Sequence, residues 1–347
     1  MICDDSVVIR GAMARMLESD HGIRVVARAA HGQAALDALA RQPIDVLVLD
    51  IEMPQMDGLT ALPLLLRADP GLRVIMASTL TTRGAEIAMQ ALRLGAADYV
   101  PKPSVAAIGD DSFRTELLAK VKGLARQRRR PARPAVQVPP RPLRAPPIQA
   151  PLLLAIGSST GGPQALFTLI QGLGGPVPVP VVITQHMPAT FTAILAEHIA
   201  RLGIMPCAEH RDGQPLRPGH IHLAPGDRHL LVEGRAGALI GRLSDGAAEN
   251  FCRPAVDPML RSAAAACGGR VLVVMLTGMG QDGLIGTRAV IEAGGAAIAQ
   301  DEATSVVWGM PGAVAQAGLC HHVLALPAIA PRLRDTFRMA PLRTQPA

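Results

Sequence analysis

Three residues that together could form a nucleophilic triad follow three apolar runs in the second half of this 347-residue chain. Ser159 comes shortly after the run LLLAIG, His186 after VPVVIT and Asp282 after VLVVMLT. Each run is short and continuous, which is typical of a strand buried on both faces, and ligands bind where the carboxyl ends of such strands meet. The pattern therefore predicts acyl hydrolysis, in which Ser159 attacks carbon, His186 moves the proton and Asp282 orients the imidazole.

The turn that carries Ser159 reads Gly-Ser-Ser-Thr-Gly and fits the pattern G-x-S-x-G. Its glycines permit a tight turn between strand and helix, and the helix start offers N–H groups to an oxyanion. We expect the backbone amides near Thr160 and Met279 to hold that oxyanion. A phosphate-binding loop is the alternative, but no lysine follows as a Walker loop requires. The chain order Ser, His, Asp also differs from the order in α/β-hydrolases, so it does not indicate that fold.

A second group of polar residues lies at predicted strand ends in the first half of the chain. Asp4 and Asp5 precede a helical pattern, Asp50 ends the run IDVLVL, Ser78 follows RVIMA, and Lys102 follows AADYV. Three crowded carboxylates repel one another unless a cation intervenes, and their hard oxygens suit Mg²⁺. Asp50 is then a candidate phosphoryl acceptor, with Lys102 and Mg²⁺ neutralising the transferred charge and the Ser78 hydroxyl bonding a phosphoryl oxygen. Taken one at a time, each residue is better explained as a helix cap or a surface group. All five at the ends of neighbouring strands favour a phosphorylation site.

Strand and helix patterns alternate in both halves, which predicts the α/β class with parallel, doubly wound sheets. In the first half we expect strands over 44–49, 73–77 and 96–100, and helices over 6–17, 32–41 and 112–125. In the second half we expect helices over 162–171, 191–202, 255–267, 284–293 and 310–317, and further strands over 221–224, 229–233 and 296–299.

An Arg- and Pro-rich segment separates the two halves, so we expect a first domain over 1–122, a linker over 123–150 and a second domain over 151–340. Prolines deny the segment helix and sheet bonding, and like charges repel, so it should be an extended tether. The alternative is a docking site for an acidic partner or an anionic membrane surface.

Composition excludes several function classes. The net charge of +6 depends on nine basic residues between Lys120 and Arg144; without them the balance is about −3. With only 2% aromatic residues the chain lacks a stacking platform for single-stranded nucleic acid, so we expect no nucleic-acid partner. It has no apolar run of about 18–20 residues and no signal sequence, which predicts a cytoplasmic protein without membrane insertion. Five scattered cysteines indicate neither a zinc site nor a disulfide framework.

The first half resembles the receiver domain of response regulators through DDS at 4–6, LDIEMPQMDG at 49–58, Ser78 and DYVPKP at 98–103. The resemblance implies a flavodoxin-like fold and phosphorylation of Asp50 by a chemotaxis histidine kinase. It implies that Asp5, Asp50 and the Glu52 carbonyl hold Mg²⁺, with Asp4 as a further residue of the metal site. It also puts Tyr99 in the aromatic switch position.

The first strand of that domain is short. Only Met1-Ile2-Cys3 precedes the acidic pair, whereas about five or six apolar residues are expected of a strand. We therefore hypothesise that the native start lies upstream of Met1, which intact-mass measurement of the native protein would test.

The second half resembles the chemotaxis protein-glutamate methylesterases, which are also glutamine deamidases. The matching stretches are AIGSSTGGP (155–163), TQHMP (184–188), LRPGHIHLAPGDRHL (216–230), CRPAVDPMLRSAA (252–264), LTGMGQDG (276–283) and QDEATSVVWGMPGAV (300–314). The resemblance implies hydrolysis of glutamyl γ-methyl esters on the cytoplasmic helices of methyl-accepting chemotaxis receptors, with release of methanol, and deamidation of particular receptor glutamines. It puts Ser159, His186 and Asp282 at the catalytic positions and the Met279 amide in the oxyanion hole, with no cofactor needed. We expect a monomer that the unphosphorylated receiver inhibits by covering the Ser159 edge.

Three other interpretations make different predictions. A phosphorylation-controlled adaptor predicts a missing triad member, and none is missing. A DNA-binding regulator predicts a compact helix-turn-helix of roughly 60–100 residues after the receiver, but strand–helix alternation follows instead. A hydrolase of small esters stays open on the residues themselves, and only the family resemblance argues for a protein substrate.

Overall fold

The computed structural model describes residues 1–78, 81–102, 111–128, 149–235 and 238–339. The chain divides into two compact units, Met1–Val136 and Gln137–Ala347. Most of the expected linker, residues 129–148, lies outside the described ranges.

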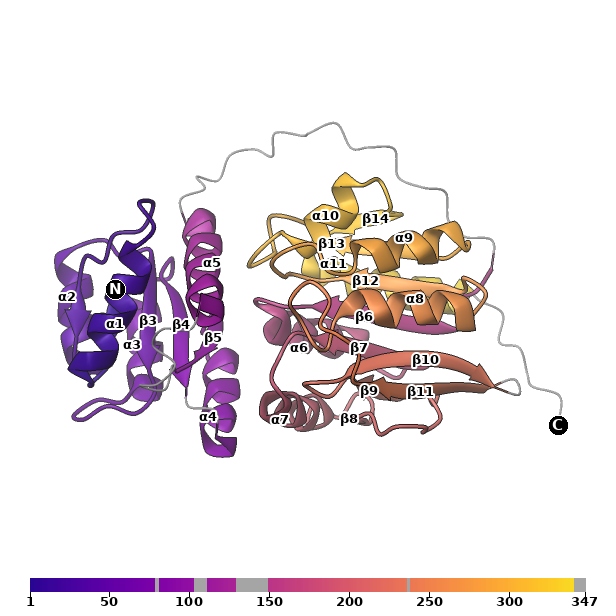
Figure 1. The fold of residues 1–347 in the computed structure, drawn as a ribbon, viewed down its shortest axis with the longest axis horizontal. Coiled ribbons are helices and arrows are strands. Elements are labelled where there is room, and N and C mark those ends of the chain that lie inside the picture. Colours follow the sequence, from indigo (N-terminus) through magenta and orange to yellow (C-terminus); the bar gives the residue numbers. More distant parts are fainter. Residues whose placement is uncertain (79–80, 103–110, 129–148, 236–237, 340–347) are drawn as a thin grey trace. The chain divides into compact units, whose positions relative to one another are not determined.

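The first unit contains a five-stranded parallel sheet in the order β2-β1-β3-β4-β5, of which Figure 1 labels β3, β4 and β5. Its strands are β1 (Ile2–Cys3), β2 (Arg28–Ala29), β3 (Val46–Asp50), β4 (Arg73–Ser78) and β5 (Asp98–Pro101). Its helices are α1 (Val7–Glu18), α2 (Gly32–Arg41), α3 (Gly58–Ala68), α4 (Thr82–Arg93) and α5 (Asp111–Arg128). This is the predicted doubly wound α/β arrangement, with β3 and β4 fully or almost fully buried.

Two boundaries in this unit follow from specific contacts. The strand β1 is only two residues long but pairs with both β2 and β3, and the Met1 ammonium donates to the Val46 carbonyl at 2.8 Å. Helix α5 runs to Arg128, past the expected domain end at residue 122 and the expected helix end at 125. The Arg128 guanidinium donates to the Ile44 carbonyl at 2.6 Å and pairs with Asp69 at 2.7 Å. These bonds attach the last turn to the first unit.

The second unit contains a seven-stranded parallel sheet in the order β14-β13-β12-β6-β7-β9-β8. Its strands are β6 (Leu153–Ser158), β7 (Val181–Gln185), β8 (Cys207–Glu209), β9 (Ile221–Leu223), β12 (Val271–Met275), β13 (Ala296–Gln300) and β14 (His322–Leu324). The strands β10 (His229–Arg235) and β11 (Ala238–Ser244) form a separate two-stranded antiparallel ribbon. The helices are α6 (Gly162–Leu173), α7 (Ala189–Ala200), α8 (Val256–Ala266), α9 (Leu284–Glu292), α10 (Met310–Gln316) and α11 (Leu326–Met339).

Helices cover both faces of this sheet, with α8 and α9 in front and α6 and α11 behind in the view of Figure 1. The core between α8, α9, α10 and the sheet consists of Val, Leu, Met and Ala side chains, as the aromatic-poor composition requires. Helix α8 also packs against β10, so the ribbon extends the core. None of the described helices has both the length and the apolar character that a membrane crossing requires.

Candidate active site

Three adjacent strands, β12, β6 and β7, bring the predicted triad to one edge of the second sheet. Their ends are in register, with Met275 opposite Gly157 and Ser158 opposite Gln185. Ser159 follows β6 directly, His186 follows β7 directly, and Asp282 lies in the turn between β12 and α9. The strands are buried along their whole length, so polar side chains gather where the strands end.

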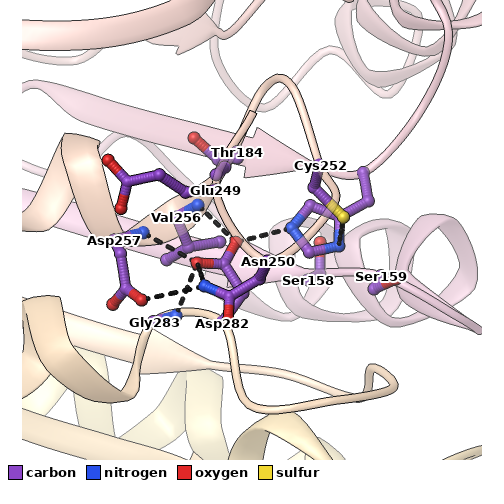
Figure 2. Close-up of polar contacts among 12 residues, drawn as sticks. Ser158, Ser159, Thr184, Glu249, Asn250, Cys252, Val256, Asp257, Asp282 and Gly283 are labelled. Atoms are coloured by element: carbon purple, nitrogen blue, oxygen red, sulfur yellow. Dashed lines mark hydrogen bonds and ion pairs between the residues drawn. The ribbon is translucent and has the colours of Figure 1, made fainter. Parts of the chain in front are cut away.

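The strongest contact at this edge joins His186 to Asp282. Nε2 of His186 lies 2.7 Å from Oδ2 of Asp282, and both side chains are largely buried. The carboxylate also accepts backbone N–H groups from Val256 (2.6 Å), Asp257 (3.0 Å) and Gly283 (2.9 Å), as Figure 2 shows. Burial alone raises the pKa of Asp282, but the hydrogen bond and charge of His186 and the amides at the start of α8 outweigh it, so its pKa is lowered. Asp282 therefore remains an anion that can orient and stabilise an imidazolium.

The other nitrogen of the same ring faces a cysteine. Nδ1 of His186 lies 3.4 Å from Sγ of Cys252, which sits in the loop before α8. Burial lowers the pKa of His186, but the hydrogen bonds to Asp282 and Cys252 raise it to about 9. The imidazole is thus a strong base with one nitrogen bound to a carboxylate and the other directed at a thiol.

The nucleophile turn is held from beneath by a buried network. The Ser158 hydroxyl donates to Oε1 of Gln185 at 2.6 Å, and Nε2 of Gln185 donates to the Ser159 carbonyl at 2.9 Å. The start of α6 is packed so closely that a Cβ at Gly162 would lie 1.9 Å from Oε1 of Gln185. Ser158 is therefore a structural group, and Ser159 is the serine of this turn that is left partly exposed.

Ser159 lies close to the turn that leads to Asp282, and among the described residues no hydrogen bond joins its hydroxyl to the imidazole of His186, which contacts Asp282 and Cys252. The N–H of Ser159 donates to the Thr277 carbonyl at 3.0 Å, and a Cβ at Gly278 would lie 2.9 Å from the Cβ of Ser159. A catalytic hydrogen bond of this kind commonly tightens only when a substrate binds.

The expected oxyanion donors lie on either side of Ser159. Thr160 is the next residue in the turn, and Met279 follows Gly278, whose carbonyl accepts from the amides of Gly309 and Met310. Among the residues that the structure describes, no protein acceptor takes a hydrogen bond from the amide of Thr160 or of Met279. Both donors are therefore available to a substrate oxygen.

Sequence reasoning missed the contribution of the loop at 249–252. Asn250 donates to Oδ1 of Asp282 at 3.2 Å and to Asp257 at 3.1 Å, while Cys252 faces His186. The only signal is that the stretch beginning at Cys252 resembles the methylesterases, because a loop contact has no periodic pattern. Burial and the charge of Asp282 raise the pKa of Asp257 to about 6.

Three aspartates of the first unit lie together at the carboxyl edge of its sheet. Asp4, Asp5 and Asp50 each place a carboxylate oxygen within 4.8 Å of the others. Nζ of Lys102 lies 2.5 Å from Oδ2 of Asp50 and 3.1 Å from Oδ2 of Asp4. Burial raises the pKa of Asp50 to about 6, against the opposing effect of Lys102. Three carboxylates with one lysine leave an excess negative charge, a donor set that fits a hard divalent cation.

The remaining predicted receiver residues lie around this cluster. Glu52 is exposed, and its N–H donates to Asp50 at 3.4 Å. The Ser78 hydroxyl donates to the Gly84 carbonyl of α4 at 2.8 Å. The Tyr99 ring is buried, with Nζ of Lys120 5.0 Å from its centre. The structure therefore places Asp4, Asp5, Asp50 and Lys102 together, with Ser78 attached to α4 and Tyr99 packed beneath α5.

Comparison with known proteins agrees with this division of the chain. Residues 154–333 match the family described as CheB methylesterase, and residues 1–108 match the response regulator receiver domain. A protein-glutamate methylesterase/protein-glutamine glutaminase of Paramagnetospirillum magneticum is 53% identical, over 95% of this chain and 94% of its own length. One from Azospirillum brasilense is 55% identical, over 96% and 91%.

Among solved structures, the Thermotoga maritima CheB methylesterase catalytic domain is 38% identical with a TM-score of 0.52, over 54% of this chain and 99% of that one. The chain is therefore a hydrolase that belongs to the CheB methylesterase family, with a response regulator receiver domain ahead of its catalytic domain.

Proposed function

We propose that this hydrolase uses Ser159, His186 and Asp282 to demethylate glutamyl γ-methyl esters and to deamidate glutamines on methyl-accepting chemotaxis receptors, and that phosphorylation of Asp50 activates it. The observation that carries the catalytic part is the 2.7 Å contact between His186 and Asp282 at the strand edge that also presents Ser159. The relatives' names supply the substrate class.

The contacts of the imidazole support different roles for its two nitrogens. Nε2 is held by Asp282, so Nδ1 is the atom that exchanges protons with Ser159. In the first step Nδ1 accepts the Ser159 proton as Oγ attacks the ester carbonyl, and the oxyanion accepts from the amides of Thr160 and Met279. The intermediate collapses as Nδ1–H protonates the leaving methoxide, which departs as methanol; from a glutamine, ammonia departs instead.

A water molecule then completes the cycle. Nδ1 accepts a proton from water, the hydroxide attacks the acyl carbon, and Ser159 leaves with its proton restored, which frees the glutamate. Asp282 keeps its charge throughout and stabilises the imidazolium that forms in each half-reaction.

The receiver residues have separate roles in this proposal. Asp50 accepts the phosphoryl group from a chemotaxis histidine kinase, and Asp4, Asp5, Asp50 and the Glu52 carbonyl would hold Mg²⁺, which neutralises charge on the phosphoryl oxygens. Lys102, already at Asp50, supplies a second positive charge, and Ser78 and Tyr99 respond to the modified site. A cytoplasmic location and a monomeric state belong to the same proposal.

The test measures methanol release from membranes that contain methylated receptors. Wild type should release methanol, Ser159→Ala should reduce the rate by about 10⁴-fold or more, and Ser244→Ala on β11 serves as a matched control at the wild-type rate. A small phosphodonor should stimulate wild type but not Asp50→Asn. Equal methanol release by Ser159→Ala would refute the catalytic assignment, and equal stimulation of Asp50→Asn would refute the switch.

A further inference from the structure

The turn at 249–252 presents the most exposed aromatic side chain of the described residues. Phe251 has a relative exposure of 104%, whereas the other four phenylalanines and Tyr99 are buried. Single exposed apolar residues are common on protein surfaces and need no function. Phe251 differs from such residues in two ways. Its backbone has a positive φ, and its two chain neighbours contact Asp282 and His186.

The backbone at this position is strained. Glu249 and Cys252 exchange two hydrogen bonds, of 3.1 Å and 2.9 Å, and close a tight turn around Asn250 and Phe251. Both central residues have positive φ, 52° for Asn250 and 63° for Phe251. Asn tolerates this region, but a bulky side chain is rare there, and Gly is the usual choice in turns of this kind. The turn therefore holds a phenyl group outward at a conformational cost, a condition that occurs mainly at functional sites.

The residues on both sides of Phe251 contact the triad. Asn250 donates to Asp282 at 3.2 Å, and Cys252 lies 3.4 Å from His186. Glu249 fixes the base of the turn through two bonds with Arg261, at 2.6 Å and 2.9 Å. Figure 2 shows Asn250 directed at Asp282, with Cys252 on the same loop. Since neighbouring Cα atoms are about 3.8 Å apart, Phe251 must lie at the rim of the catalytic groups.

We propose that Phe251 is a specificity-determining residue, whose ring packs on an apolar side chain of the helical protein substrate beside the glutamyl ester. The inference rests on the proposed function, because it takes the ester to be carried on a helix. Residues three and four positions away share a helix face with the ester-bearing residue, so an apolar neighbour there would lie against the rim. A small free ester has no such neighbour and gains nothing from the ring.

The experiment compares kcat/KM for methylated receptor membranes with kcat/KM for a small soluble glutamyl γ-methyl ester. Phe251→Ala should lower the receptor-to-small-ester ratio at least tenfold, equivalent to about 1.4 kcal/mol, mainly through a higher KM for receptors. Phe251→Leu, which keeps an apolar side chain, should retain most of the ratio. Leu152→Ala removes another exposed apolar group, at 39% exposure beside the start of β6, and should leave the ratio unchanged.

Folding is checked by thermal unfolding, and Phe251→Gly provides a second variant because Gly suits the positive φ. An unchanged receptor-to-small-ester ratio in both Phe251→Ala and Phe251→Gly would overturn the inference. Equal losses of kcat/KM on the two substrates would also overturn it, because the turn would then only support the triad. The proposed function fails separately if wild type hydrolyses the small ester but releases no methanol from receptors, and the inference then fails with it.

Discussion

The thiol of Cys252 lies 3.4 Å from Nδ1 of His186, on the opposite side of the ring from Asp282. In the proposed mechanism Nδ1 is the nitrogen that reaches Ser159, so the thiol and the serine hydroxyl would compete for one position on the base. The contact also contributes to the raised pKa of His186, about 9, which keeps most of the imidazole protonated at neutral pH.

Replacement of Cys252 by alanine should therefore move the pH dependence of the enzyme. A general base works only when neutral, so activity rises with pH up to the pKa of His186. Loss of the thiol removes one contribution that raises this pKa, so the midpoint of kcat/KM against pH should fall by about one unit. The measurement is hydrolysis of a small ester from pH 6 to 10, with Cys207→Ala as the control. An unchanged midpoint would mean that Cys252 has no influence on the base.

Asp282→Asn should lower kcat by about 10⁴-fold, because the amide neither carries the charge that stabilises the imidazolium nor fixes the tautomer. Asp245→Asn, an exposed change of the same chemistry, is the control.

The folded pKa of Asp282 is lowered, so its charge stabilises the fold above the unfolded value near 3.8, and this contribution is lost as pH falls below it. In denaturant unfolding, the stability difference between wild type and Asp282→Asn should therefore shrink below about pH 4. A difference that is constant with pH would contradict this.

Gly162→Ala should destabilise the catalytic unit although alanine is the better helix former. The added Cβ would lie 1.9 Å from Oε1 of Gln185, which bonds Ser158, so the network beneath the nucleophile must shift. We expect a loss of about 1–3 kcal/mol in the free energy of unfolding and a lower kcat. Gly175→Ala, where a Cβ meets nothing within 4 Å, is the matched control. Wild-type stability in Gly162→Ala would show that Gln185 moves without cost.

Mg²⁺ should stabilise the receiver unit in calorimetry, and the effect should weaken as pH falls through about 6. That value is the raised pKa of Asp50, and a protonated carboxyl group is a poor ligand for the cation. Asp5→Asn should reduce the Mg²⁺-dependent shift of the receiver transition, while Asp37→Asn on α2 should not. A shift of equal size in Asp5→Asn would exclude Asp5 from the ligands.

The elements with a clear period and clear ends could be predicted from the sequence. Helix α2 spans Gly32–Arg41 as expected, and α1 begins after Ser6, whose side chain accepts from the Ile9 amide. The helices α3, α4 and α11 lie outside the predicted elements. Both α3 and α11 contain an internal proline, Pro63 or Pro331, which usually indicates a break. The sequence pattern ends α5 too early because Arg128 looks like part of a basic linker until its contacts with Ile44 and Asp69 are seen.

The same distinction holds for the candidate site. The positions of Ser159, His186 and Asp282 could be predicted because strand ends place side chains at a known edge. The contacts of Asn250 and Cys252 could not, since they depend on the path of a loop that is far from both His186 and Asp282 in the chain. A hydrogen bond between Ser159 and His186 likewise depends on side-chain rotation, which no sequence pattern encodes.

Strand β6, which precedes Ser159, lies between β7 and β12, although β7 and β12 are far apart in the chain. During biosynthesis β6 and β7 emerge first, while β12, which closes the other flank of β6, is made only after residue 270. On the proposed mechanism, the enzyme therefore becomes active only after most of the polypeptide has been synthesised and β12 has paired with β6. A fragment that ends before Val271 would keep Ser159 and His186 but lack Asp282, so we expect incomplete chains not to remove methyl groups.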